Sequence, residues 1–153
     1  MTIRVLTPQA LQAQLHTAER LCKQRNKRLT PLRRKVLELL IRAERGLKAY
    51  ELLEQIQADH PNAAPPTVYR ALDFLTEQEL IHRLDAVNAW SACVDAAGKP
   101  HDLFVVCTNC RQVVELHAPD LSEQLAHCIA LAGFSFDAQE TELRALCNDC
   151  VAA

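Results

Sequence analysis

Two CxxC pairs constrain the fold of this chain more than any other feature of its sequence. Cys107 and Cys110 form one pair, and Cys147 and Cys150 form the other. Each pair can present two thiolates to one ion from a tight turn, and four thiolates satisfy tetrahedral zinc. The separation of the pairs exceeds the roughly 15 to 20 residues of a compact zinc finger. We therefore expect a structural zinc ion that ties the end of the chain back to an earlier hairpin.

Redox chemistry is the main alternative for these cysteines. The chain begins without the apolar core of a signal peptide and has no apolar run of the roughly 18 residues that span a bilayer, so we expect a cytosolic protein. Cytosolic thiols stay reduced, which argues against a disulfide framework for the seven cysteines. A thioredoxin-like CxxC would open a helix, whereas RQVVEL after Cys110 has the pattern of a strand. Metal binding is the favoured interpretation, and Cys22 and Cys128 are expected to be packing residues.

The charge of the chain is divided unevenly between its two halves. Residues 1–93 hold 14 Lys and Arg against 10 Asp and Glu, whereas residues 94–153 hold 3 against 9. Such asymmetry is common in proteins that join a nucleic-acid reader to an acidic module, although a basic run can also be a solvated helix face. The densest basic stretch contains no acidic residue and comprises Arg20, Lys23, Arg25, Lys27, Arg28, Arg33, Arg34 and Lys35.

Four helical patterns occupy the first half of the chain, each with apolar residues three and four positions apart. The second begins at Thr30, a capping residue followed by Pro31, and is expected to end at Gly46. The third ends at His60, and the fourth starts at Pro66. The buried positions expected in the first, third and fourth helices are Leu11, Leu15, Ala18, Cys22, Ala49, Leu52, Leu53, Ile56, Val68, Ala71, Leu72 and Leu75.

A hairpin is predicted directly after these helices, in IHRLDAVNAWSACV. Helices followed by a hairpin make a winged helix, in which the last helix enters the major groove and the wing touches the backbone. The periodicity of that last helix leaves Thr67, Tyr69 and Arg70 pointing outward near its N-terminus. The first half is therefore a candidate DNA-binding domain.

The second half is predicted to be a smaller mixed domain, which makes the chain α+β. Two strands flank the CTNC turn, a helix runs from Asp120 to about Ala132, and a further strand lies near FSFDA. The resulting division is a winged-helix domain at 1–94, a hinge at 95–100 and a metal-binding domain at 101–153.

A second metal site is possible among residues that are scattered through the sequence. If the hairpin turns symmetrically at Val87 and Asn88, His82 falls opposite Cys93, and cross-strand partners can share an ion. A metal that also reached His101 and Glu115 would bridge the two domains, as a sensor requires. Taken singly, each residue can instead be an ordinary surface or packing residue, and spacing alone leaves the question open.

The residues that carry the motifs resemble the ferric uptake regulator family, and within it the zinc-sensing regulators. The resemblance covers nearly the whole chain and rests on CKQRNKRLTPLRRKVLELL, AYELL, PPTVYRALDFL and the two CxxC pairs. It implies a homodimer with an N-terminal winged helix and a C-terminal α/β dimerisation domain. It also implies repression of zinc uptake genes by binding palindromic, AT-rich operator DNA when metal is abundant.

The resemblance also assigns residues. It implies two zinc ions per monomer, a structural ion on Cys107, Cys110, Cys147 and Cys150 and a regulatory ion on His82, Cys93, His101 and Glu115. Tyr50, Tyr69 and Arg70 match positions that face DNA, to which we add Thr67, with Arg28 and Arg33 at phosphates.

One departure from the iron-sensing pattern favours zinc as the regulatory metal. Iron sensors carry HHDH ahead of the first CxxC, where this chain reads HDLF and keeps only His101. Oxygen and nitrogen ligands suit iron and manganese, whereas a thiolate from Cys93 favours zinc. The alternatives are a relative that senses another metal and a constitutive DNA-binding protein with structural zinc only.

A zinc enzyme is the rival from another class, and the sequence opposes it. The chain contains neither HExxH nor the HxE and PCxxC pair of zinc deaminases. We therefore expect no catalytic activity and no small-molecule substrate.

Overall fold

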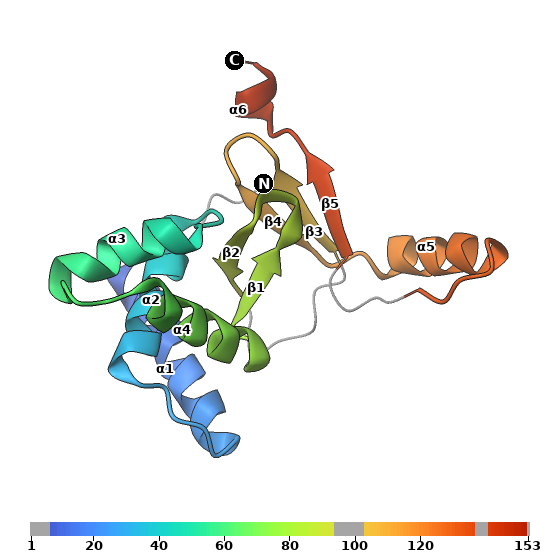
Figure 1. Ribbon diagram of the computed structural model, residues 1–153. Coiled ribbons are helices and arrows are strands. Elements are labelled where there is room, and N and C mark those ends of the chain that lie inside the picture. The colour runs from blue at the N-terminus through green and yellow to red at the C-terminus, as the bar shows by residue number, and fades with distance from the viewer. Residues whose placement is uncertain (1–6, 94–102, 137–140, 153) are drawn as a thin grey trace.

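The first half of the chain is a helical unit that carries a β-hairpin. The structure, a computed structural model, describes residues 7–93, 103–136 and 141–152. Figure 1 shows the helices gathered on one side, with the hairpin leading from them toward a second sheet. The elements of this half are α1 (Pro8–Gln24), α2 (Pro31–Ala43), α3 (Ala49–Asp59), α4 (Pro65–Glu77), β1 (Ile81–Leu84), the 3-10 turn η1 (Asp85–Val87) and β2 (Ala89–Ala92).

The core of this half lies where the apolar periodicity placed it. All four residues predicted for α1 and all four predicted for α4 are buried, as are Leu52 and Ile56 of α3. Ala49 and Leu53 are half-buried and pack against the same cluster. Thr30 caps α2 as expected, its hydroxyl accepting a hydrogen bond from the Arg33 amide at 3.5 Å. Burial of this continuous apolar surface stabilises the unit.

Gly46 does not end α2, contrary to the prediction. The helix stops at Ala43, and Glu44 takes the left-handed conformation with φ 52°. Gly46 instead passes close to the hairpin, where an added Cβ would lie 2.9 Å from Leu84 Cδ1 and 3.2 Å from Ala89 Cβ. Its lack of a side chain is therefore needed for close packing rather than for a helix cap. The start of α4 at Pro65 differs from the prediction by one residue.

The register of the hairpin also differs from the prediction. His82 pairs with Ser91, not with Cys93, and the last pair before the turn is Leu84 with Ala89. The turn is not symmetric about Val87 and Asn88, because η1 fills it and Asn88 closes it in the left-handed conformation with φ 48°.

The second half contains a three-stranded sheet in the order β4-β3-β5. Strand β3 pairs antiparallel with β4 and parallel with β5, so the two strands around CTNC and the following helix are confirmed. The strand predicted near FSFDA is not found at residues 134–136; residues 137–140 lie outside the described part of the chain, and β5 begins at Thr141. The elements are β3 (Leu103–Cys107), β4 (Val113–Leu116), α5 (Pro119–Leu131), β5 (Thr141–Ala145) and α6 (Asn148–Val151). The whole is α+β, as predicted.

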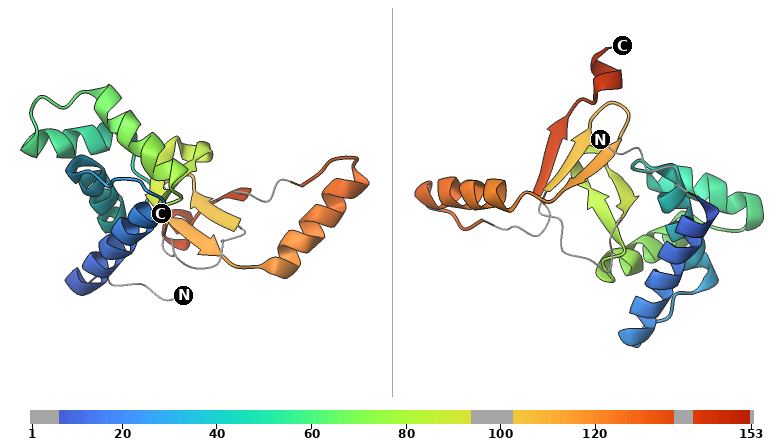
Figure 2. Two further views of the ribbon diagram at one scale, coloured as in Figure 1. Left: turned by 90° about the horizontal axis from the view of Figure 1, so that it is seen from below. Right: turned by 180° about the vertical axis from the view of Figure 1, so that it is seen from behind.

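Helix α5 projects away from the rest of the chain, as all three views show (Figures 1 and 2). None of its residues is buried, and Cys128 on it is exposed, so the packing role predicted for Cys128 is not met within one chain. Cys22 is buried as predicted. Among the helices that the structure describes, none combines the length and apolar character needed to cross a membrane.

Candidate metal centres and nucleic-acid interface

The four cysteines of the two CxxC pairs converge at one end of the second sheet. Their sulfur atoms all lie within 4.8 Å of one another. The Sγ atoms of Cys110 and Cys147 are 3.6 Å apart, close to the roughly 3.8 Å edge of a tetrahedron with zinc–sulfur bonds of about 2.3 Å. The cluster joins the end of β3 to the segment after β5, as the spacing predicted. The donor set and its geometry fit a tetrahedral zinc ion.

Local hydrogen bonds prepare this cluster for a cation. The backbone N–H groups of Cys110 and Cys147 donate to Cys107 Sγ and lower the pKa of the Cys107 thiol to about 6. A hydrogen bond from Asn109 lowers the pKa of Cys150, but the neighbouring thiols more than offset it and raise that pKa to about 12. Four crowded sulfurs cannot all be thiolates without a positive charge among them, which a zinc ion would supply.

His82, Cys93 and Glu115 form a second cluster, although they lie far apart in the sequence. One ligand atom from each lies within 4.8 Å of the others. His82 belongs to β1, Cys93 follows β2 and Glu115 belongs to β4. Because His82 pairs with Ser91, Cys93 is its diagonal neighbour on the same face of the hairpin, within reach of a long side chain. The fourth predicted ligand, His101, lies outside the described residues.

Contacts around the second cluster hold the hairpin against the sheet. The ring of His82 packs on Phe104, with centroids 4.4 Å apart, and Phe104 pairs with Glu115 across β3 and β4. Imidazole, thiolate and carboxylate together suit a borderline-soft ion such as zinc better than magnesium or calcium. An ion held by all three would join the first half of the chain to the second.

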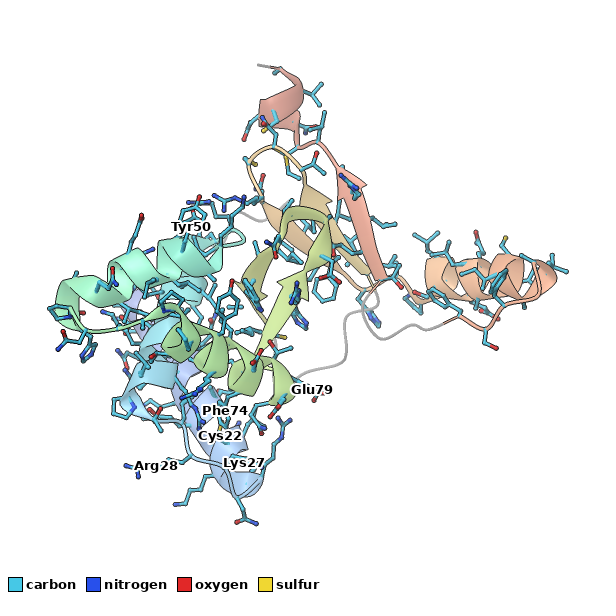
Figure 3. All side chains as sticks on the ribbon, in the orientation of Figure 1. Cys22, Lys27, Arg28, Tyr50, Phe74 and Glu79 are labelled. Carbon is cyan, nitrogen blue, oxygen red and sulfur yellow. The ribbon has the colours of Figure 1, made fainter. Side chains whose placement is uncertain are left out.

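The side chains that the sequence analysis assigned to DNA from α4 lie near its N-terminus. Tyr69 and Arg70 are exposed near its N-terminus, whereas Thr67 is half-buried rather than fully outward. The ring of Tyr69 meets Trp90 of β2 edge-on, with centroids 6.0 Å apart, which fixes its direction. Tyr50 is exposed at the start of α3 (Figure 3). The structure thus places these predicted residues at the surface.

The two basic residues predicted to meet phosphates differ in their surroundings. Arg28 is exposed in the loop between α1 and α2 (Figure 3). Arg33 is half-buried, its guanidinium stacks 3.6 Å over the Phe74 ring, and it donates a hydrogen bond to the Arg28 carbonyl at 2.9 Å. Arg33 therefore shapes the loop that presents Arg28.

Glu142 is a site residue that the sequence analysis did not identify. Its carboxylate accepts hydrogen bonds from the backbone N–H groups of Asp85 and Ala86 at 2.9 and 3.0 Å. The turn of the wing is thereby held on β5, three residues from His82. No sequence signal marks this role, because an isolated Glu in a strand is usually solvated.

The comparisons agree with this arrangement. Residues 24–144 match the ferric uptake regulator family. The chain is 38% identical over 147 residues to the zinc uptake regulation protein of Escherichia coli (strain K12), covering 95% of this chain and 84% of that protein.

Two solved structures are similar over almost the full length. A zinc uptake regulator complexed with zinc and DNA is 36% identical, with a TM-score of 0.81 over 96% of this chain and 97% of that one. The holo form of XcZur is 40% identical, with a TM-score of 0.73 over 92% and 99%. The family match covers well over half of the chain, and the chain belongs to the ferric uptake regulator family.

Proposed function

We propose that this protein is a zinc-responsive transcriptional repressor that binds palindromic, AT-rich operator DNA as a homodimer when zinc is abundant, and so controls zinc uptake genes in the cytoplasm. The convergence of His82, Cys93 and Glu115 from two separate parts of the chain carries the proposal. The name of the Escherichia coli relative and the zinc- and DNA-bound state of the solved relative support it. It is a regulator rather than an enzyme.

Each protomer holds two zinc ions with different roles. The four-cysteine site is structural, because it closes the β3–β4 turn against the end of the chain and offers no open position to a substrate. The second ion is regulatory, bound by His82, Cys93, Glu115 and His101. Its ligands come from both sides of the predicted hinge at 95–100, so binding narrows the relative positions of the parts 1–94 and 101–153.

The DNA surface is built on α4 and the start of α3. Arg70 donates to a guanine edge in the major groove, which presents two acceptors. Tyr50, Thr67, Tyr69 and Arg28 contact the DNA around it, and Arg33 acts at phosphates through the loop that it supports. These roles are inferred from position and exposure.

A partner subunit covers the apolar surface of the second half. A helix with apolar side chains and no buried residue needs a partner to be stable in water. Dimerisation through this surface places two copies of α4 about 34 Å apart, on successive turns of the major groove. The large exposed apolar residues there are Val114, Leu116, Leu121, Leu131, Phe134, Leu143, Leu146 and Val151.

The switch needs only a modest free energy. Zinc that favours the DNA-competent arrangement by about 3 kcal/mol raises its population relative to the other arrangements by roughly 150-fold. Linkage then requires that operator DNA strengthens zinc binding by the factor by which zinc strengthens operator binding.

The test is operator binding by a Cys93→Ser variant during a zinc titration. The probe is a duplex selected from a random-sequence pool by the zinc-loaded protein, followed by fluorescence anisotropy. Cys128→Ser is the control for a cysteine-to-serine substitution outside both clusters, and its dimer mass is measured as well because α5 carries part of the proposed dimer surface. We expect Cys93→Ser to remain a folded dimer with its structural zinc but to lose zinc-dependent binding.

Three results would contradict the proposal. If Cys93→Ser binds the duplex with the zinc dependence of the parent, the second cluster is not the switch. If the parent binds equally well with and without added zinc, the protein is a constitutive DNA-binding protein with structural zinc only. A response to iron or manganese in place of zinc would indicate a relative that senses another metal.

A further inference from the structure

We propose that Arg111 and Glu51 form a latch that positions the DNA-reading helices on the four-cysteine site, separately from the regulatory zinc ligands. The inference rests on the proposed function and deepens it, because it gives the structural zinc site a part in DNA binding. The latch joins the residue after Cys110 to the first turn of α3, next to Tyr50.

The latch is a two-pronged ion pair. The Nη1 atom of Arg111 lies 2.5 Å from Glu51 Oε2, and its Nη2 atom lies 2.9 Å from Glu51 Oε1. Both side chains are mostly shielded from solvent, with 18% and 17% of their surfaces exposed. Paired, charge-assisted hydrogen bonds of this kind fix both distance and orientation. They also lower the pKa of Glu51 to about 2, the Arg111 hydrogen bonds being the largest cause.

Glu51 does more here than cap a helix. Its Oε2 atom accepts the backbone N–H of Lys48 at 2.7 Å, which satisfies one free N–H group at the start of α3. One oxygen would suffice for that purpose, yet both oxygens also contact Arg111, and Arg45 adds a further contact at 3.2 Å. The carboxylate therefore serves the local cap and a residue 60 positions away.

The backbone of Arg111 shows that the contact has a cost. Arg111 takes the left-handed conformation with φ 64° in the turn after the first CxxC pair. A left-handed conformation costs an L-residue about 1 kcal/mol relative to glycine. Glycine would fit this turn without strain, but it has no side chain to reach Glu51. The strained residue is thus explained by what its side chain holds.

The main chain of Arg111 also contacts the segment before α3. Its carbonyl accepts the backbone N–H of Gly46 at 2.9 Å, and the adjacent Gln112 forms a β-bridge with Arg45. Side chain and main chain of one residue therefore hold the segment from Arg45 to Glu51. This segment contains Tyr50, for which the proposed function gives a contact with DNA.

The arrangement in which the latch forms is similar over 96% of the chain to that of the zinc- and DNA-bound relative. The latch therefore favours the DNA-competent arrangement. The latch also makes the DNA-competent arrangement depend on the turn at Cys110, which the structural zinc ion shapes. Loss of the structural zinc ion would therefore release the start of α3 as well as the end of the chain.

The test compares Arg111→Gly, Arg111→Lys and Glu51→Gln, with Glu54→Gln as the matched control. Glu54 is an exposed carboxylate on the same helix, so its substitution removes the same charge without touching the latch. Zinc content and dimer mass, measured by native mass spectrometry, establish that each variant is folded. Operator affinity at saturating zinc and hydrogen exchange of the amides of residues 47–53 without DNA are then measured.

We expect Arg111→Gly and Glu51→Gln each to keep two zinc ions and to lose about 10-fold in operator affinity, the effect of losing paired charge-assisted hydrogen bonds. Arg111→Lys should lose less. The double variant Arg111→Gly/Glu51→Gln should be no weaker than either single variant, because they remove one shared interaction. Glu54→Gln should match the parent.

Additive losses in the double variant, or affinities within twofold of the parent, would overturn the latch. So would loss of zinc from Arg111→Gly, because that result would show a purely structural role. The hydrogen-exchange measurement separates the latch from the proposed function. Faster exchange at residues 47–53 in Arg111→Gly supports the latch even if the parent fails to respond to zinc. Unchanged exchange at these residues refutes the latch.

Discussion

Gly46→Ala should loosen the contact between the wing and the second half of the chain, and so weaken zinc binding at the second cluster. Gly46 lies between the hairpin and Arg111, and the next residue, Leu47, exchanges two backbone hydrogen bonds of 2.9 Å with Trp90. A displaced residue 46 therefore moves both the wing and the segment that Arg111 holds. His82 lies on that wing.

The magnitude follows from the space available for a methyl group. An added Cβ would lie 2.9 Å from Leu84 Cδ1 and 3.2 Å from Ala89 Cβ, whereas carbon atoms pack best at about 3.5 to 4.0 Å. Leu84 and Ala89 are themselves buried, with 1% and 0% of their surfaces exposed, so neither can move into solvent. Overpacking of this kind costs about 1 to 3 kcal/mol. In a domain of roughly 60 to 100 residues, the size class of the helical unit with its hairpin, a loss of about 1 kcal/mol already lowers Tm by about 4 °C.

The assay is thermal unfolding at fixed protein and zinc concentrations, together with the affinity of the second zinc site. Leu84→Val removes part of the side chain that the new methyl group meets. The double variant Gly46→Ala/Leu84→Val should therefore lose less stability than the sum of the two single variants. Gly133→Ala separates backbone strain from overpacking: no atom lies within 4 Å of its added Cβ, so any loss of stability there comes from its φ of 86°.

The reasoning would be refuted by a Gly46→Ala variant whose Tm and zinc affinity both match those of the parent. Fully additive effects of Gly46→Ala and Leu84→Val would refute the steric explanation alone.

Outcomes are also expected for four other variants. Cys147→Ser should lose the structural zinc, measured by mass spectrometry, and lower Tm or dimerisation; a variant that melts normally with full zinc content contradicts the four-cysteine assignment. Arg70→Ala should weaken operator binding by about 1 to 3 kcal/mol and relax base preference in competition assays, whereas Arg28→Ala should weaken all duplexes alike and reduce the salt dependence of binding. Glu142→Ala should free the turn of the wing and weaken the second zinc site by about 10-fold, the effect of two hydrogen bonds to a charged group at a partly exposed position; unchanged zinc affinity would exclude that coupling.

Local patterns predicted the helical core and the four-cysteine cluster well. Apolar spacing in α1 and α4 fixed the buried faces, because period and burial are the same property of an amphipathic helix. The four-cysteine cluster was predictable because it forms wherever the two tight CxxC turns lie side by side. The strands predicted around the first pair favoured that arrangement. Thr30 and Pro31 marked the start of α2 through the chemistry of capping.

Features that depend on register were predicted poorly. His82 and Cys93 do meet, but as diagonal neighbours, because the 3-10 turn adds residues that a symmetric hairpin lacks. The strand expected near FSFDA shows the same weakness: Phe134 is 72% exposed, and the strand that pairs with β3 begins later, at Thr141. Alternation of apolar residues describes a face but does not choose a partner strand.

Apart from the cluster of His82, Cys93 and Glu115, contacts between the two halves could not be predicted from the sequence. Glu142, Arg111 and Gly46 each act through a residue distant in sequence, and none belongs to a motif. The sequence predicts that Gly46 ends α2, because a glycine after a helix most commonly takes the left-handed conformation that ends it. Its actual role depends on how closely the hairpin approaches.

The central claim is that a second zinc ion, bound across the two halves of the chain, switches DNA binding on. It is tested most directly by measuring operator binding and zinc content on the same samples as zinc is added to protein that has been mildly chelated. The account predicts weak operator binding with one zinc per protomer and full binding with two. Full operator binding with one zinc per protomer would contradict it.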